Sequence, residues 1–181
     1  METIEELKKP GPWGVGLKWG IIGGIVIVLI SYIASMGVDW SDPELLEKSG
    51  KRWSQYLGYL ILALIIVVAQ IEHRNKELGG FMGYGRAVGI ATITALGAGI
   101  CMAIYMFVFF GILHPEFQQL IIENALSKMN DLPSGQEDQV ISMMKMTTSP
   151  AAMALFTFIG NVFVGLVAGL ITGIFTHKVE A

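Results

Sequence analysis

Three basic side chains around a glycine-rich segment are the residues best suited to chemistry in this sequence. Arginine side chains can hold two phosphate oxygens at once, and glycines let backbone N–H groups approach an anion closely. We therefore predict lipid or anion contacts through Arg74, Lys76, Gly79, Gly80, Tyr84 and Arg86. The alternative is that the basic residues only set the orientation of the chain in a membrane.

Other chemistry finds little support. The sequence contains no GxSxG, P-loop, HExxH or CxxC motif, so we expect no catalytic residue and no enzyme activity. His73, His114 and His177 lie at predicted membrane boundaries and nothing groups them, so we expect no metal ion and no cofactor. Cys101 lies alone in an apolar segment, where a packing thiol is expected. No basic run indicates a nucleic-acid partner.

Four long apolar segments must position these residues. They cover about residues 14–37, 53–71, 86–113 and 150–176, and each approaches or exceeds the roughly 20 apolar residues needed to cross a bilayer as a helix. Only 15% of the chain is charged, against roughly 25% in soluble domains. We predict an all-α integral membrane protein with four transmembrane helices, forming a single membrane domain over residues 1–181.

The polar excursion at residues 114–149 is predicted to be an external amphipathic helical hairpin between spans three and four. Apolar residues recur with helical period from Phe117 to Leu126 and again around Glu137–Met146, with a break at Leu132–Gly135. Ser149 and Pro150 are typical of a helix start and should open the last span. A further short helix is expected after Ser41.

Glycines recur every fourth residue near both ends of the chain, at Gly16, Gly20 and Gly24 and at Gly165, Gly169 and Gly173. This spacing makes a flat strip on one helix face, where another backbone can come close. Asn161 is a polar residue within the last span, and we predict an interhelical hydrogen bond, with a substrate contact as the alternative. The predicted spans contain no deep carboxylate, which argues against a proton-coupled carrier.

These features lead to two main hypotheses and a weaker one. The strips offer more close-packing surface than four helices need, which favours a non-enzymatic helix-bundle subunit that forms a homo-oligomer or joins other membrane protein subunits. The alternative is a component that binds or transports a lipid or lipid-linked substrate, with membrane lipids as its partners. A membrane enzyme is the third interpretation.

The distribution of lysine and arginine predicts the topology. With both termini in the cytoplasm, seven of these residues lie inside and five outside. The sequence thus predicts a multi-pass protein whose 72–86 loop is cytoplasmic and whose 114–149 excursion is external. The acidic first residues and the length of the first apolar segment favour a permanent anchor over a cleaved signal peptide.

The second loop also carries a family resemblance. His73–Lys76 followed by Gly79–Ala87 resembles the signature of a bacterial membrane family called domain of unknown function 4199, in which two glycines precede an aromatic-glycine-basic-alanine run. His114-Pro115-Glu116 is similar to an Asp-Pro-Glu element of that family, with histidine in the aspartate position. The resemblance covers about Gly14 to His177. It implies a four-span protein of the bacterial inner membrane and no particular activity.

Overall fold

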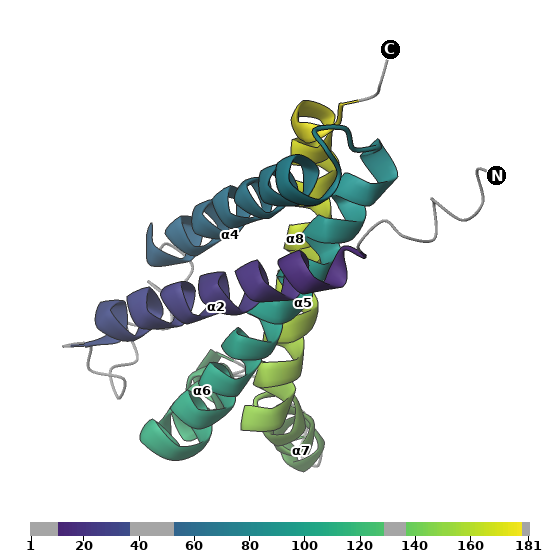
Figure 1. The fold of residues 1–181 in the computed structure, drawn as a ribbon. Helices are drawn as coiled ribbons and strands as arrows, with labels where there is room; N and C mark the ends of the chain where they lie inside the picture. Colours follow the sequence, from purple (N-terminus) through teal and green to yellow (C-terminus); the bar gives the residue numbers. More distant parts are fainter. Residues whose placement is uncertain (1–10, 37–52, 129–136, 179–181) are drawn as a thin grey trace.

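The computed structural model describes residues 11–36, 53–128 and 137–178 (Figure 1). The short helix expected after Ser41 and the break at 132–135 lie outside these residues. Four long helices make up the body of the molecule: α2 (Trp13–Ser35), α4 (Trp53–Glu72), α5 (Tyr84–Val108) and α8 (Pro150–Thr176). Single π-helical turns extend α4 over His73–Glu77 and α5 over Phe109–Leu113. Two shorter helices, α6 (Glu116–Lys128) and α7 (Glu137–Thr147), precede α8.

The four long helices confirm the predicted fold class. Each is long and apolar enough to cross a membrane, over Trp13–Ser35, Tyr56–Glu77, Tyr84–Leu113 and Pro150–Thr176. Their outer surfaces carry large apolar side chains, such as Phe175 at 80% exposure, whereas glycine and alanine fill many of the contacts between helices. A water-soluble protein would bury the large residues. The arrangement is that of an all-α protein with lipid as its solvent.

The helix boundaries differ from the prediction at the second loop. Sequence reasoning ended the second span at residue 71, but the helix continues to Glu77 through its π-helical turn. The third span begins at Tyr84 rather than at residue 86. Apolar composition marks where side chains meet hydrocarbon, but a helix can continue past that point because its backbone hydrogen bonds are internal.

The start of α8 matches the prediction at Pro150. The hydroxyl of Ser149 accepts a hydrogen bond from the backbone N–H of Ala152 at 3.3 Å, and Pro150 occupies the first turn, where no intrahelical N–H partner is required. Both features are local, which is why the sequence could locate this boundary.

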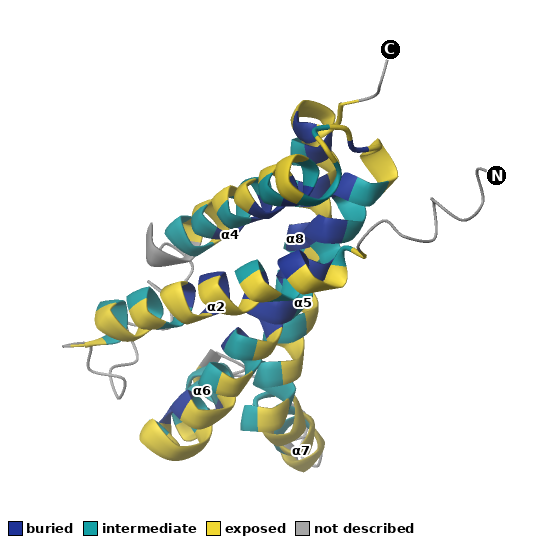
Figure 2. Ribbon diagram, in the orientation of Figure 1, coloured by how far each residue is buried: buried dark blue, intermediate teal, exposed yellow. Residues whose placement is uncertain are grey.

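The long helices form two pairs that cross (Figure 1). In one pair α5 and α8 run side by side, and in the other α2 and α4 do so. Helices α2, α4 and α8 all contact α5, and buried residues gather along α5 and on the sides of its neighbours (Figure 2). Because successive long helices alternate in direction, the start of α2, the turn after α4 and the end of α8 meet at one end. We call this the loop end; α6 and α7 lie at the opposite end (Figure 1).

The N-terminal glycine strip packs against α5. A Cβ atom at Gly20 would lie 2.5 Å from the carbonyl oxygen of Thr94 and 3.0 Å from Cα of Gly97, so the two backbones touch. At Gly16 it would meet Ile93 and at Gly24 it would meet Cys101, each at 2.7 Å.

The C-terminal strip packs against a second face of the same helix. A Cβ atom at Gly165 or Gly169 would overlap the methyl group of Ala95 or Ala91, and one at Gly173 would lie 3.1 Å from the ring of Tyr84. Both glycine strips therefore pack against α5 of the same chain.

Asn161 does not make the predicted interhelical hydrogen bond. Its amide nitrogen donates to the carbonyl oxygen of Thr157, one turn earlier in α8, at 2.9 Å. The side chain is long enough to reach its own backbone, which removes the need for a partner on another helix. Asn161 nevertheless lies at the α5 contact, since its Cβ atom faces Gly99.

Helices α6 and α7 cover the two segments predicted to be helical between spans three and four. The side-chain amide of Gln118 on α6 donates to the carbonyl oxygen of Lys145 on α7 at 2.9 Å. The amphipathic hairpin and its external location stay predictions.

Candidate functional site at the loop end

Two glycines and a backbone clip shape the segment between α4 and α5. Gly79 and Gly80 have positive φ angles of 65° and 99°, which side chains other than glycine rarely adopt. The N–H of Gly80 closes the turn by donating to the carbonyl oxygen of Arg74 at 2.8 Å. Met82 and Lys178 then exchange two backbone hydrogen bonds, at 2.8 and 2.9 Å. The segment is thus attached to the chain that follows α8.

Arg74 and Arg86, the two arginines among the predicted anion contacts, point at protein groups. Arg74 donates from Nη1 to the carbonyl oxygen of Thr176 at 2.9 Å, which satisfies a carbonyl at the end of α8. Its Nε donates to Asn75 at 3.0 Å. Arg86 donates from Nε to His73 Nε2 at 3.2 Å. The structure therefore gives both guanidinium groups a part in holding the loop end together.

A buried polar link joins α4, α5 and α8. Gln70 is fully buried and donates its amide to the carbonyl oxygen of Ala87 at 3.0 Å. Thr176 donates its hydroxyl to the Gln70 side-chain oxygen at 3.0 Å. In a hydrocarbon surrounding, such groups are stable only when they are paired. Gln70 lies inside the second predicted span, residues 53–71, and no local pattern indicates its partners.

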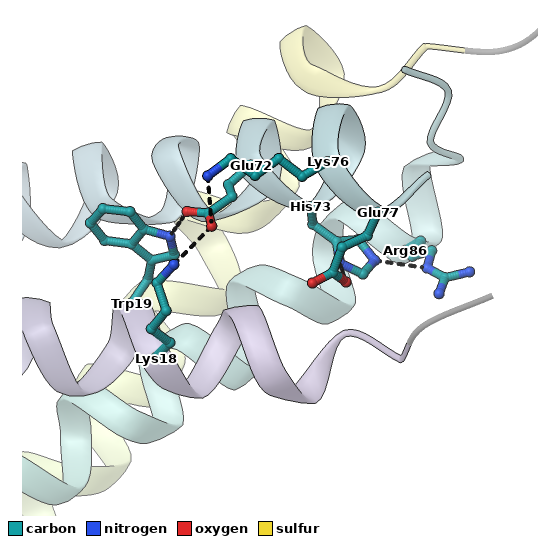
Figure 3. Close-up of polar contacts among 7 residues, drawn as sticks. All are labelled: Lys18, Trp19, Glu72, His73, Lys76, Glu77 and Arg86. Carbon is teal, nitrogen blue, oxygen red and sulfur yellow. Dashed lines mark hydrogen bonds and ion pairs between the residues drawn. The ribbon is translucent and has the colours of Figure 1, made fainter. Parts of the chain in front are cut away.

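His73 lies at the centre of a second polar group (Figure 3). The ring is fully buried, and its Nε2 accepts from Arg86, which leaves the ring proton on Nδ1. Nδ1 lies 2.7 Å from Oε2 of Glu77, within ion-pair distance, although the direction is not that of a hydrogen bond. His73, Glu77 and Arg86 thus connect the π-helical turn to the first turn of α5.

Glu72 links α4 to α2 (Figure 3). Its Oε1 lies 2.8 Å from Nζ of Lys18 and 3.4 Å from Nζ of Lys76, while its Oε2 accepts from the indole N–H of Trp19 at 2.6 Å. We call these four residues the Glu72 cluster. Sequence reasoning did not find it, because Lys18 and Glu72 are 54 positions apart. The available signal was that both lie at the predicted cytoplasmic boundary of their spans.

Tyr84, another predicted contact, and Lys178, which was not predicted, both help to fix the segment. Tyr84 donates its hydroxyl to the carbonyl oxygen of Leu170 on α8 at 3.0 Å, and its ring meets His177 edge-on. Lys178 lies with its ammonium group 5.7 Å from the centre of the Phe81 ring. Lys76 is the predicted contact that remains most open, with 72% of its side chain exposed.

The part of the chain that the structure describes contains no group of side chains suited to bind a metal ion. No three His, Cys, Asp or Glu side chains in residues 11–36, 53–128 and 137–178 are grouped to hold an ion. His114 lies at the other end of the molecule, where its Nδ1 is 3.0 Å from Glu116.

The four long apolar helices define a multi-pass membrane protein. Polar contacts between the helices close its loop end. The chain belongs to the family described as protein of unknown function, DUF4199, whose pattern matches residues 18–178. That match covers the four long helices and the whole loop end apart from the first turns of α2. Searches of curated proteins and of solved structures found no match.

Proposed function

We propose that this chain is a non-enzymatic membrane subunit that assembles with a second copy of itself, or with another membrane protein, through the outer face of α5. The observation that carries the proposal is an open strip of small residues there. Gly85, Gly89 and Thr92 share one side of α5, away from the sides that receive the glycine strips of α2 and α8. A Cβ atom at Gly85 or Gly89 would meet no atom within 4 Å.

Small residues on a lipid-facing helix surface allow a second helix to approach closely, and such approach is a main source of helix association in membranes. The glycine strips of α2 and α8 are already in contact with α5, so they no longer support assembly. The hypothesis now rests on the third set of small residues.

The non-enzymatic part of the proposal is supported by the use of the polar residues. Gln70, Thr176 and Arg74 hydrogen-bond to other helices or to helix ends. These three side chains therefore fasten the helices to one another. We further propose that the loop end faces the cytoplasm from a bacterial inner membrane, on the basis of the seven-to-five distribution of basic residues.

A matched pair of variants tests the assembly face. Gly89→Leu places a large side chain on the outer face of α5, and Gly160→Leu places the same side chain on α8, where an added Cβ atom likewise meets nothing within 4 Å. Both changes replace a glycine within a helix, so their effects on helix propensity are alike. Native mass spectrometry after mild extraction should show an assembly for the wild type and for Gly160→Leu, and a monomer for Gly89→Leu.

A monomeric wild type would contradict the proposal, as would equal assembly of all three proteins. Thermal unfolding measured on the same samples establishes that each variant is folded.

A lipid-binding or transport component is the second candidate. The exposed lysines at the loop end favour it: the side chain of Lys76 is 72% exposed and that of Lys18 is 49% exposed. Basic residues beside a membrane attract anionic lipids by about 1 kcal/mol each. Retention of anionic lipid through purification would support this candidate, and purification free of lipid would contradict it.

A further inference from the structure

The Glu72 cluster places two lysine ammonium groups beside one carboxylate oxygen. Lys18 belongs to α2 and Lys76 to the π-helical turn after α4, and both Nζ atoms lie within 3.4 Å of Glu72 Oε1. Trp19 fixes the other carboxylate oxygen through its indole N–H. The spacing of the two cations is therefore set by a side chain that is itself held in place, rather than by chance proximity of two flexible chains.

The cluster carries a surplus of positive charge and of hydrogen-bond donors. The two ammonium groups and the one carboxylate give the cluster a formal net charge of +1. Each ammonium group has three N–H donors, of which Glu72 takes one. The carboxylate is largely covered, at 15% exposure, whereas the lysine side chains are far more open. The Lys18 ammonium group also lies 5.1 Å from the centre of the Trp19 ring, and the remaining donors of the two exposed lysines are open to the surroundings of the protein.

The surroundings at this level are the edge of the bilayer. Lys18 and Glu72 lie near the ends of candidate spans, and Trp19 has the amphipathic ring that favours the headgroup region. The stem of Lys18 reaches from α2 towards Glu72 on α4 (Figure 3), and lysine at helix ends commonly keeps its ammonium group at the membrane boundary. Headgroup phosphates occupy the same layer.

We propose that Lys18 and Lys76, held together by Glu72 and Trp19, bind the phosphate of an anionic lipid headgroup. A phosphate diester offers two charged oxygens, enough to accept from both ammonium groups. Arg74 and Arg86 are not the primary contacts, because their hydrogen bonds to Thr176 and His73 are part-buried, whereas the side chains of both lysines are exposed. The inference rests on the lipid-binding candidate above and assigns it a site.

The test compares three lysine variants of the full chain in nanodiscs made from equal parts of phosphatidylglycerol and phosphatidylcholine. Lys76→Gln and Lys18→Gln each remove one cation of the cluster. Lys178→Gln is the control, because it removes an exposed cation at the same end that contacts Phe81 rather than Glu72. Mass spectrometry of the retained lipid gives the ratio of the two lipids for each protein.

We expect the ratio of phosphatidylglycerol to phosphatidylcholine to fall about fivefold in each cluster variant, the effect of one well-placed lysine. Lys178→Gln should change it by less than half as much. Lys76 is largely exposed, so its loss should leave thermal unfolding unchanged and the result interpretable.

Different outcomes of this experiment would contradict the proposed lysine site and the lipid-binding candidate. A wild type whose lipid ratio equals the one-to-one input would overturn both the site and the lipid-binding candidate. A wild type enriched in phosphatidylglycerol, with equal losses of enrichment in all three variants or with no loss, would overturn only the site. Millimolar inorganic phosphate should leave the lipid ratio unchanged; its displacement of phosphatidylglycerol would mean that the cluster binds free phosphate instead.

Discussion

The contact between Gly165 and Ala95 makes the sharpest prediction about how α8 packs on α5. A methyl group added at Gly165 would overlap the methyl group of Ala95, whereas carbon atoms in contact normally lie about 3.5–4.0 Å apart. Gly165→Ala must therefore push the two helices apart. Ala95→Gly removes the opposing methyl group, so the two changes together exchange the positions of a glycine and an alanine across one contact.

The expected magnitude follows from two opposing terms. Overpacking typically costs about 1–3 kcal/mol, while replacing glycine with alanine in a helix gains about 1 kcal/mol in propensity. Gly160→Ala, on the same helix but with nothing within 4 Å of its Cβ, shows the propensity gain alone. The gap in unfolding free energy between Gly165→Ala and Gly160→Ala should thus be about 1–3 kcal/mol.

The assay is equilibrium unfolding in mixed detergent micelles, followed by circular dichroism, for the wild type and four variants. Gly165→Ala should be less stable than Gly160→Ala. The double variant Gly165→Ala with Ala95→Gly should be more stable than the sum of its parts predicts, by about 0.5–3 kcal/mol.

Equal stability of Gly165→Ala and Gly160→Ala would refute the reasoning, because it would mean that α8 does not lie against α5 at this point. Strict additivity in the double variant would refute the assignment of Ala95 as the opposing residue.

Three further predictions concern the rest of the chain. Gln70→Leu removes two buried hydrogen bonds, to the carbonyl oxygen of Ala87 and from the hydroxyl of Thr176, so thermal unfolding in detergent should show a loss of about 1–3 kcal/mol; an unchanged midpoint would contradict the role of this link. Cysteines introduced at Lys76 and Lys128 should react with impermeant reagents from the cytoplasmic and external side, respectively, and labelling of position 128 from the cytoplasm alone would overturn the topology. The Glu116 carboxyl, hydrogen-bonded first to its own backbone N–H and then to His114, has a pKa below its ordinary value of 4.5, so its contribution to stability is present above that value and is lost as the pH falls below it; Glu116→Gln should flatten this acid-side decline in the unfolding midpoint, and an unaltered pH profile would count against it.

The sequence alone determined the class of fold and most of its elements. Four apolar segments of spanning length can satisfy their backbone hydrogen bonds in lipid only as helices or a closed barrel, and their length and composition favour helices. Ser149 and Pro150 fixed a helix start through contacts within one turn. Glycine spacing likewise identified flat helix faces, because a period of four residues keeps side chains on one side of a helix.

Only the tertiary structure decided what those faces and polar residues contact. The spacing of Gly20 or Gly165 shows that something approaches closely, but not that both strips meet α5 and leave a third set of small residues open. Arg74 and Arg86 looked suited to an anion, yet their nearest acceptors are a carbonyl at the end of α8 and the ring of His73. Glu72 contacts Lys18 and Trp19 on a helix more than 50 positions away. Periodicity and capping depend on neighbours along the chain, whereas these pairings depend on how the helices cross, which no local pattern specifies.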